Sequence, residues 1–399
     1  MITLADIRSA AEQIERVVHR TGVTSSEALA HLAGRPVLLK HEETQRTGSF
    51  KIRGAYNLIS RLPELATEVV AASAGNHAQG VALAASLTGR RSTIFMPANA
   101  PLPKTEATRG YGADVRLEGE VVDDCLAAAQ AYAHDTGAVF VPPFDHPLVI
   151  AGQGTIGLEI AADAPDADVV VVPIGGGGLI SGVATALAHT RRGVRVVGVE
   201  AAGAAKMRAS LAAGHPVRLD AIATMADGIA LKTPCELTLA HVKAYVDDVV
   251  TVTEEEISRA VLLLAERAKA VVEPSGAVAL AAILAGRVGG TGPALAVCSG
   301  GNVDPLLLMR LIDHGLSAAG RYMLLRIVLP DRPGALAELT ALVADMNLNV
   351  LEVEHHRAGV RLGVDEVEVL LTLETRDPAH RDETVTALRD AGLRVELVR

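Results

Sequence analysis

From about residue 65 to residue 315 the chain repeats one arrangement of apolar and polar positions. A short apolar run rich in Val and Ala comes first, a loop of Gly and Asn follows, and an Ala/Leu-rich stretch of helical length completes the pattern. The apolar runs include 69–72, 168–174, 194–200 and 294–298. Strands that alternate with helices predict an α/β fold with a parallel sheet covered on both faces. Ligands of such sheets bind beyond the carboxyl ends of the strands, where these glycine loops lie.

The pattern changes at the segment 313–320, which we interpret as a linker. We predict one domain over 1–315, a linker over 316–321 and a second domain over 322–399. The predicted elements of the second domain are strand 322–329, helix 334–346, strands 349–357 and 366–374, helix 378–391 and strand 393–398. This order is typical of a ferredoxin-like fold. The loops of this domain hold few residues suited to chemistry, so we interpret it as a sensor.

The overall composition narrows the class of protein. The chain has 399 residues, of which 49% are apolar and 21% charged, a balance typical of globular domains. Lys and Arg number 37 against 47 Asp and Glu, so the formal net charge is −10. A negative field repels phosphate backbones, and aromatic residues at 2% leave few rings for stacking on bases. We therefore expect no nucleic-acid partner.

Cysteine usage and the apolar stretches bear on the compartment. Cys125, Cys235 and Cys298 have neither disulfide nor zinc spacing, which favours a reducing compartment. The first eight residues carry charges where a signal peptide is apolar, so we expect a cytoplasmic protein. The uncharged stretch 169–188 is long enough to span a bilayer, but Pro173 and four consecutive glycines disfavour a helix there. No membrane partner is expected.

The four glycines Gly175, Gly176, Gly177 and Gly178 lie between a predicted strand and a helix that begins near Leu179. Without Cβ atoms, consecutive backbone N–H groups can close around an anion, aided by the helix N-terminus. We interpret the run as a phosphate-binding loop. The loop lacks the Gly-Lys-Ser/Thr ending of a nucleotide P-loop and departs from Gly-x-Gly-x-x-Gly.

A dinucleotide alternative stays open on the sequence. Glu200 ends the next predicted strand at about the distance at which an acidic residue contacts a ribose. A purely structural turn is a second alternative for the glycines, although four of them cost ordering entropy. The glycine run therefore predicts a phosphate without deciding which molecule carries it.

Lys51 lies between Phe50 and Ile52, close to a glycine turn. Lysines are mostly solvated surface charges, but these apolar neighbours favour a buried amine. A buried lysine has a lowered pKa and can bond covalently to an aldehyde. A reactive lysine together with a phosphate loop indicates a phosphorylated aldehyde, which is pyridoxal phosphate.

Two further loops follow predicted strands. The segment Ser73, Ala74, Gly75, Asn76 and His77 opens a helix, so its N–H groups can hold a carboxylate. The Asn76 amide can donate a hydrogen bond to an oxygen on the cofactor ring, or it can act only as a helix cap. His77 is expected to make a structural hydrogen bond.

Ser299 follows the strand at 294–298. A neutral hydroxyl that faces a pyridine nitrogen would leave that ring largely unprotonated, although a serine can also be a simple helix cap. The turn 273–276, Glu-Pro-Ser-Gly, could support the site from behind or simply start a helix, and we interpret it as a helix start.

Taken together, the motifs at 49–55, 73–78, 175–178 and 299–302 resemble the threonine dehydratases, also called threonine ammonia-lyases. The resemblance covers about 1–315 and implies a pyridoxal-phosphate enzyme of the tryptophan-synthase-β type, fold type II. In that fold a small lobe, here about 42–141, is inserted in a larger lobe. The C-terminal domain resembles an ACT domain, a module that binds amino-acid effectors at paired interfaces.

The resemblance also implies roles for individual residues. Lys51 would hold pyridoxal phosphate and act as the catalytic base, with Phe50 packed near the ring. Asn76 would bond the ring oxygen, and Ser299 would face the pyridine nitrogen. The phosphate would bind to Gly175, Gly176, Gly177, Gly178 and Leu179, and the substrate to Ser73, Ala74, Gly75, Asn76 and His77.

The implied reaction is the deamination of L-threonine to 2-oxobutanoate and ammonia by β-elimination of water, with L-serine as a second substrate. The implied regulation is feedback by an amino acid, isoleucine or valine, bound to the ACT domain. Paired ACT domains would also imply a homo-oligomer, a dimer or a tetramer.

Two positions separate this chain from serine racemases of the same fold. Those racemases carry a serine, the second acid/base, where this chain has Ala74. They also bind a divalent cation through a glutamate like Glu200 and an acid six residues later, where this chain has Lys206, so we expect no metal. The alternatives are a serine racemase or serine dehydratase, an NAD-binding oxidoreductase, and a non-catalytic amino-acid sensor.

Overall fold

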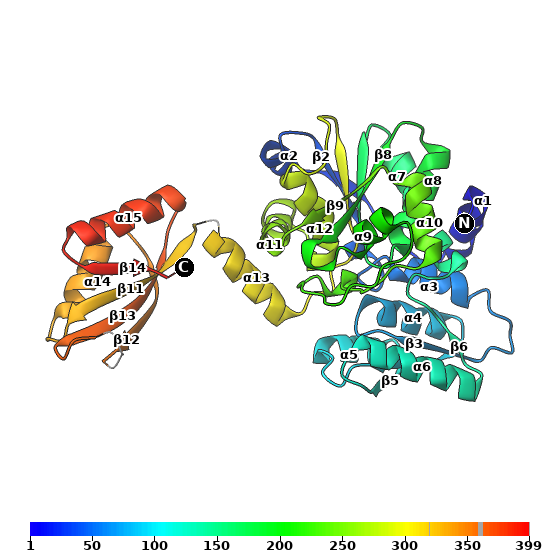
Figure 1. Cartoon of the computed structure of the whole chain (residues 1–399), viewed down its shortest axis with the longest axis horizontal. Helices are drawn as coiled ribbons and strands as arrows, with labels where there is room; N and C mark the ends of the chain where they lie inside the picture. Colours follow the sequence, from blue (N-terminus) through cyan, green and yellow to red (C-terminus); the bar gives the residue numbers. More distant parts are fainter. Residues whose placement is uncertain (319, 358–361, 399) are drawn as a thin grey trace. The chain divides into compact units, whose positions relative to one another are not determined.

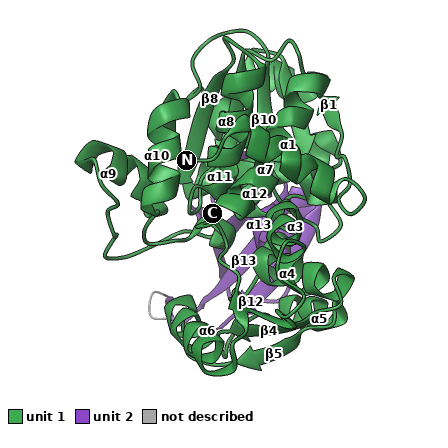
Figure 2. Ribbon diagram, turned by 90° about the vertical axis from the view of Figure 1, so that its right-hand side faces the viewer, with its two compact units in different colours: residues 1–308 green, residues 309–399 purple. Residues whose placement is uncertain are grey.

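The computed structural model describes residues 1–318, 320–357 and 362–398. It divides into two compact units, Met1–Leu308 and Met309–Arg399 (Figure 2). The division lies within helix α13 (Pro305–Ala318), so the segment interpreted as a linker is helical up to Ala318. Ala319 of that segment lies outside the described residues. Ala and Leu favour a helix, and the single Gly315 costs it only about 1 kcal/mol, which is why this segment can continue one.

The larger lobe of unit 1 is built on a six-stranded sheet in the order β1-β2-β10-β7-β8-β9 (Figure 1). All its strands are parallel except β1, which pairs antiparallel to β2. The strands are β1 (Val23–Ser25), β2 (Val37–His41), β7 (Val169–Pro173), β8 (Arg195–Ala201), β9 (Asp248–Val252) and β10 (Ala294–Cys298). The strands predicted at 168–174, 194–200 and 294–298 are thereby confirmed. Their residues are buried on both faces, which explains why they are continuous apolar runs.

Helices cover this sheet on both sides (Figure 1). Helices α7 and α8 pack against each other so closely that a Cβ on Gly182 would lie 2.4 Å from Ile150 O. The helices of this lobe are α1 (Leu4–Ile14), α2 (Glu27–Ala33), α7 (Pro147–Asp163), α8 (Gly178–Thr190), α9 (Lys206–Ala213), α10 (Glu236–Tyr245), α11 (Glu254–Leu263) and α12 (Pro274–Leu284). Shorter helical turns are η1 (Glu42–Thr44), η2 (Ala202–Ala204), η3 (Asp227–Ile229) and η4 (Leu264–Ala268).

The smaller lobe contains a four-stranded parallel sheet in the order β5-β4-β3-β6. Its elements are β3 (Glu68–Ala72), β4 (Arg91–Met96), β5 (Asp114–Leu117), β6 (Val139–Phe140), α3 (Lys51–Ile59), α4 (Asn76–Leu87), α5 (Leu102–Gly110) and α6 (Val122–Thr136). All of them lie within the expected insertion at 42–141. Helix α3 approaches α7 of the larger lobe closely, because a Cβ on Gly152 would lie 2.6 Å from Gly54 Cα.

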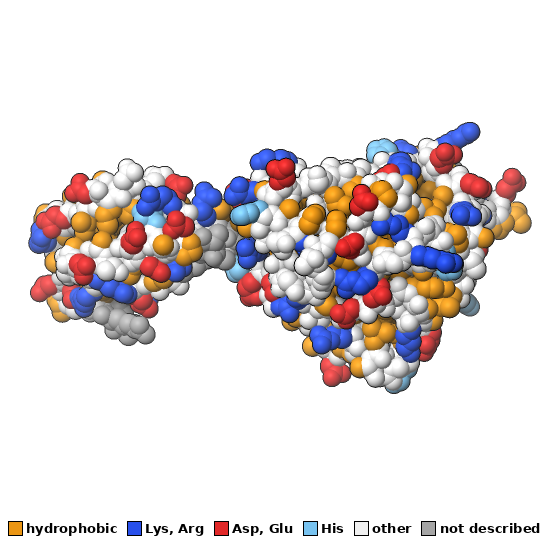
Figure 3. Space-filling view, turned by 90° about the horizontal axis from the view of Figure 1, so that it is seen from above, with side chains coloured by type: hydrophobic (Ala, Val, Ile, Leu, Met, Phe, Trp, Pro, Cys, Tyr) orange, Lys and Arg blue, Asp and Glu red, His pale blue; other side chains and the backbone are white. Residues whose placement is uncertain are grey.

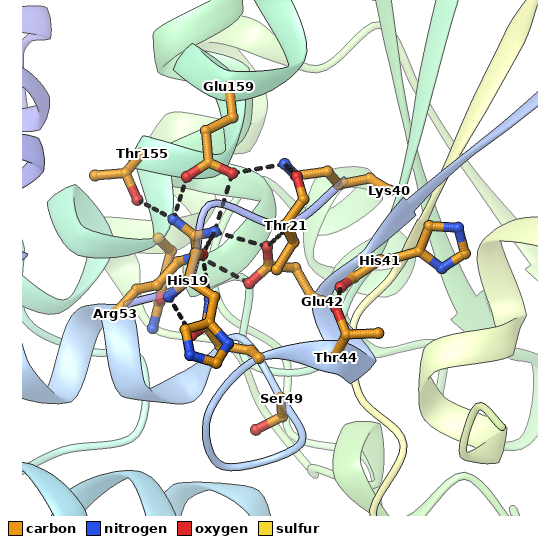
Figure 4. Close-up of polar contacts among 12 residues, drawn as sticks. His19, Thr21, Lys40, His41, Glu42, Thr44, Ser49, Arg53, Thr155 and Glu159 are labelled. Carbon is orange, nitrogen blue, oxygen red and sulfur yellow. Dashed lines mark hydrogen bonds and ion pairs between the residues drawn. The ribbon is translucent and has the colours of Figure 1, made fainter. Parts of the chain in front are cut away.

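A buried network of charges joins the two lobes beside α3 (Figure 4). The Arg53 guanidinium donates to both carboxylate oxygens of Glu42, at 2.8 Å each, and to those of Glu159 at 2.7 and 3.0 Å. Lys40 Nζ donates to Glu159 Oε2 at 2.5 Å and to Thr21 O at 2.7 Å. Two cations thus balance two carboxylates, a condition for burying charge without a large penalty. The network anchors α3 two residues after Lys51.

Unit 2 has its own sheet and core. Its sheet runs β12-β13-β11-β14, with all pairs antiparallel. Its elements are β11 (Tyr322–Pro330), α14 (Ala335–Asp345), β12 (Val350–His356), β13 (Glu366–Glu374), α15 (Pro378–Asp390) and β14 (Arg394–Leu397). The predicted order of strands and helices is confirmed. Buried residues of β11 and β13 alternate with more exposed ones and pack with α14 in a separate apolar cluster.

The surface mixes charges of both signs with scattered apolar side chains on the face shown in Figure 3. Within the described part of the chain, no helix combines the length and apolar character needed to cross a membrane. Cys125, Cys235 and Cys298 are all free thiols, and Cys125 and Cys298 are buried.

Candidate active site

Loops that follow parallel strands meet at one cavity of about 520 Å³ in unit 1. The loops after β3, β7 and β10 supply much of its wall, as expected for a site beyond the carboxyl ends of strands. Every site residue predicted from the sequence lines this cavity: Phe50, Lys51, Ser73, Ala74, Gly75, Asn76, His77, Gly175, Gly176, Gly177, Gly178, Leu179 and Ser299. The fold thus gathers four segments that are far apart in the sequence.

The glycine loop connects β7 to the first turn of α8. Gly177 has a φ of +95°, in the left-handed region that favours glycine. A Cβ on Gly176 would lie 2.3 Å from the ring of Phe144, and one on Gly178 would lie 2.9 Å from Phe144 Cβ. Bare backbone at a helix N-terminus presents N–H groups and a partial positive charge. The loop therefore has the structure of an anion cradle that side chains would fill.

Lys51 is the first residue of α3 and is held against α4, because a Cβ on Gly80 would lie 3.2 Å from Lys51 C. Its Nζ donates to Pro143 O at 3.1 Å and lies 5.1 Å from the centroid of the Phe50 ring. Burial lowers the pKa of Lys51 to about 8, against the opposing effect of the Glu273 carboxylate. A substantial fraction of this amine is neutral, and so nucleophilic, at mildly alkaline pH.

His77 lies in the first turn of α4, behind the loop that follows β3. Its Nε2 donates to Val141 O at 2.9 Å. Burial, together with the charge of Lys51, lowers the pKa of His77 to about 3. His77 is therefore neutral at physiological pH and makes a structural hydrogen bond.

Asn76 is fixed by partners from the larger lobe. Its Nδ2 donates to Glu273 Oε1 at 2.6 Å, and its Oδ1 accepts from Asn302 Nδ2 at 2.8 Å. Asn302 Nδ2 also donates to Thr47 O at 2.7 Å. Burial raises the pKa of Glu273 to about 7, and the charge of Asp227 acts in the same direction. The Asn76 amide, which we expect to bond a cofactor oxygen, thus donates to the Glu273 carboxyl in the cavity wall.

The interpretation of 273–276 as merely a helix start is incomplete. Helix α12 does begin at Pro274, but Glu273 and Ser275 also line the cavity. The buried Ser275 Oγ has no hydrogen-bond partner among the residues that the structure describes. The Glu-Pro-Ser-Gly turn was the available signal, but a proline at the first helical position explains such a turn without any site.

Two interlobe ion pairs were not foreseen from the sequence. Lys104 of α5 pairs with Asp227 of η3, and both residues line the cavity. Lys104 Nζ lies 4.0 Å from the position that a Cβ on Gly75 would occupy, so its charge faces the loop after β3. Farther out, Arg218 Nη2 pairs with Asp123 Oδ2 at 2.6 Å. The usable signal was that 97–104 follows β4, the strand next to β3 in the same parallel sheet.

These residues fit a phosphorylated aldehyde with a polar ring. The glycine loop is a cradle for the phosphate, and the Lys51 amine can react with the aldehyde. The hydroxyl of Ser275, which lacks a partner among the described residues, and that of Ser299 supply polar groups on the remaining wall. Phe50 N donates to Ser299 O at 3.1 Å, which fixes the β10 end beside Lys51. Pyridoxal phosphate has all three of the required parts.

Glu200 does not reach the cavity. Its fully buried carboxylate accepts from Met207 N at 2.8 Å and from Arg208 N at 2.9 Å, and lies 3.2 Å from Lys206 Nζ. A ribose contact by Glu200, the basis of the dinucleotide alternative, is therefore excluded. Within residues 1–318, 320–357 and 362–398, no three His, Cys, Asp or Glu side chains are grouped as metal ligands.

Comparison with known proteins identifies the class. Residues 14–300 match the family described as pyridoxal-phosphate dependent enzyme, and residues 323–392 match the ACT domain. The fold and the site thus define a pyridoxal-phosphate-dependent enzyme with a C-terminal ACT domain. The chain is also 49% identical to an L-threonine ammonia-lyase of Thermotoga maritima over 100% of both chains. It belongs to the threonine ammonia-lyase family, as the sequence motifs indicated.

Solved structures agree with this assignment. A processed threonine deaminase isoform 2 from Solanum lycopersicum superposes with a TM-score of 0.74 and 38% identity, covering 78% of this chain and 86% of that one. A maize serine racemase gives a TM-score of 0.74 at 36% identity, covering 79% of this chain and 98% of that one. The predicted fold type is confirmed. A threonine deaminase and a serine racemase, two of the enzymes considered from the sequence, are both among these similar structures.

Proposed function

We propose that this chain deaminates L-threonine to 2-oxobutanoate and ammonia by eliminating water, and that it also accepts L-serine. The observation that carries the proposal is the Lys51 amine, with a pKa of about 8, in the same cavity as the glycine loop and the loop after β3. A full-length relative named L-threonine ammonia-lyase at 49% identity supports the choice of threonine.

Lys51 has two tasks in this reaction. Its Nζ would hold the aldehyde of pyridoxal phosphate, and the same Nζ would take the proton from Cα of the substrate. When bound, the cofactor supplies an electron sink for the charge left on Cα. Close packing of Gly80 against the Lys51 backbone and the ion pairs of Arg53 hold α3 in place, so a rigid helix positions Nζ.

The substrate carboxylate is placed at the loop after β3. Helix α4 begins at Asn76, directly after Gly75, and a helix N-terminus favours an anion. Lys104 Nζ lies beside Gly75 and adds a positive charge to this position. A carboxylate bound there would compete with Asp227 for Lys104, so substrate binding and the contact between the two lobes are linked.

Ala74 favours elimination over racemisation. Inverting Cα requires a proton donor on the face opposite Lys51, and the methyl group of Ala74 offers none. We therefore expect neither D-serine nor D-threonine as a product.

The purified protein tests the proposal directly. The wild-type chain should show the visible absorption of lysine-bound pyridoxal phosphate and should release 2-oxobutanoate from L-threonine and pyruvate from L-serine. Lys51→Ala should lose both the absorption and the turnover, whereas Lys243→Ala, at an exposed position on α10, should keep them. An active Lys51→Ala enzyme, or a wild-type enzyme that yields only D-amino acids, would overturn the assignment.

We also infer that unit 2 binds an amino-acid effector, isoleucine or valine, and that pairing of ACT domains makes the protein a homo-oligomer. The ACT family match and the separate core of unit 2 support this inference. Rates on threonine should respond to isoleucine or valine in the full chain and not in a chain ending at Ala318. Light scattering should report a dimer or larger for the full chain, and a monomer that responds to neither amino acid would refute the inference.

A further inference from the structure

Lys206 is a fully buried lysine outside the cavity, at the first residue of α9. Its Nζ donates to three backbone carbonyls, Ile174 O at 3.0 Å, Ile229 O at 3.1 Å and Ala204 O at 3.2 Å. Glu200 Oε1 lies 3.2 Å away and is itself fully buried. An ammonium surrounded by four oxygens, one of them anionic, is coordinated as a bound cation would be.

Two of the oxygens around Lys206, those of Ile174 and Ile229, belong to segments at the phosphate end of the cavity. Ile174 directly precedes Gly175 of the glycine loop, and Ile229 ends η3, whose residues line the cavity. These two segments touch, because a Cβ on Gly175 would lie 3.3 Å from Gly228 O. Lys206 therefore joins the base of the glycine loop to the wall that faces it.

Glu200 completes this arrangement from β8. Its carboxylate accepts from the N–H groups of Met207 and Arg208, which open α9, and it balances the charge of Lys206. Burial alone lowers the pKa of Lys206, and Glu200 opposes that shift. A well-packed apolar pair would fill the same space without burying charge, so the ion pair is better explained by the geometry that it holds than by stability.

We propose that the Lys206 ammonium serves as an internal cation that fixes the glycine loop against the 227–229 wall, so that cofactor phosphate binding needs no dissolved cation. Lys206 is a positioning residue, because it acts through the backbone of Ile174 and Ile229. The inference rests on the proposed phosphate-binding role of the glycine loop. Oxygen distances of 3.0–3.2 Å suit an ammonium ion better than Mg²⁺, which takes oxygens at about 2.0–2.1 Å.

The test removes the tethered cation and offers a free one. Lys206→Ala leaves a space lined by the three carbonyls and Glu200. With tetramethylammonium chloride as the only salt, we expect this variant to bind pyridoxal phosphate about 10- to 100-fold more weakly than the wild type. Replacing that salt with ammonium chloride at the same ionic strength should restore the affinity, because NH₄⁺ can donate to the same oxygens and tetramethylammonium cannot. The readout is cofactor titration by absorbance.

Two comparisons make the result specific. Lys206→Met fills the space without a charge, so its cofactor affinity should fall and should not respond to ammonium. The wild-type affinity should be the same in both salts. Wild-type affinity in Lys206→Ala without ammonium, or a loss that ammonium does not reverse, would overturn the proposal.

Thermal unfolding is a second measurement, which tests the proposal even if Lys206→Ala is too unstable for cofactor titration. The thermal midpoint of Lys206→Ala should rise in ammonium chloride relative to tetramethylammonium chloride, and that of Lys206→Met should not; equal behaviour would refute the proposal. This melting comparison stands even if the wild type takes up no cofactor. In that case the proposed function fails separately from the cation inference.

Discussion

Replacing Gly176 with alanine tests whether the glycine loop works by leaving out side chains. The added Cβ would lie 2.3 Å from Cγ and Cδ1 of Phe144 and 2.4 Å from Cε1. Carbon atoms pack at about 3.5–4.0 Å, so the ring or the loop must move by more than about 1 Å. Overpacking of this kind costs about 1–3 kcal/mol. If the cofactor-bound protein alone bears this cost, it corresponds to a cofactor affinity about 5- to 150-fold weaker.

Cofactor titration of the purified variant measures this effect. Gly22→Ala is the matched control, because nothing lies within 4 Å of a Cβ at that position. Adding Phe144→Ala to Gly176→Ala removes the atoms that the new methyl group meets and should recover most of the lost affinity. Wild-type affinity in Gly176→Ala, or no recovery in the double variant, would refute the reasoning.

Three further predictions concern Lys51 and the buried charge network of Arg53. Only the neutral Lys51 amine attacks an aldehyde, so the rate at which the apoprotein takes up pyridoxal phosphate should rise with pH and level off above about 8. Glu273→Gln should move that midpoint to lower pH, because the carboxylate raises the pKa of Lys51. A wild-type midpoint near 10.5 would contradict the first prediction, and a midpoint that Glu273→Gln does not move would contradict the second. Arg53→Met should lower the free energy of unfolding by about 3–5 kcal/mol, because it leaves two buried carboxylates with one cation. Denaturant unfolding measures this, and exposed Arg109→Met should change it by less than about 1 kcal/mol; equal losses in both variants would count against the network.

Much of the site followed from local sequence. A strand, a glycine loop and a helix in succession place the loop at a strand's carboxyl end, whatever the rest of the fold does. Residues 73–77, 175–179 and 299 were therefore assignable from strand-to-helix order, and Lys51 from its apolar neighbours. The ferredoxin-like order of unit 2 also followed from local sequence, because the succession of strand and helix patterns can be read along the chain.

Other contacts depend on which distant segments the fold brings together. Glu273, Lys104 and Asp227 belong to separate elements, and nothing near each of them in the sequence indicates its partner. The segment up to Ala318 was interpreted as a linker because it contains Gly and Ser, but one Gly costs a helix only about 1 kcal/mol and the neighbouring Leu and Ala favour it.

The amino-acid sequence by itself determined the order of strands and helices, the glycine loop and the candidate lysine, because periodicity and backbone freedom are local properties. Only the tertiary structure decided that Lys51 has a lowered pKa, that Glu273 holds Asn76, and that Lys206 occupies a cage of backbone oxygens. Burial, electrostatic partners and carbonyl directions arise when remote segments pack, and no short stretch of sequence contains them.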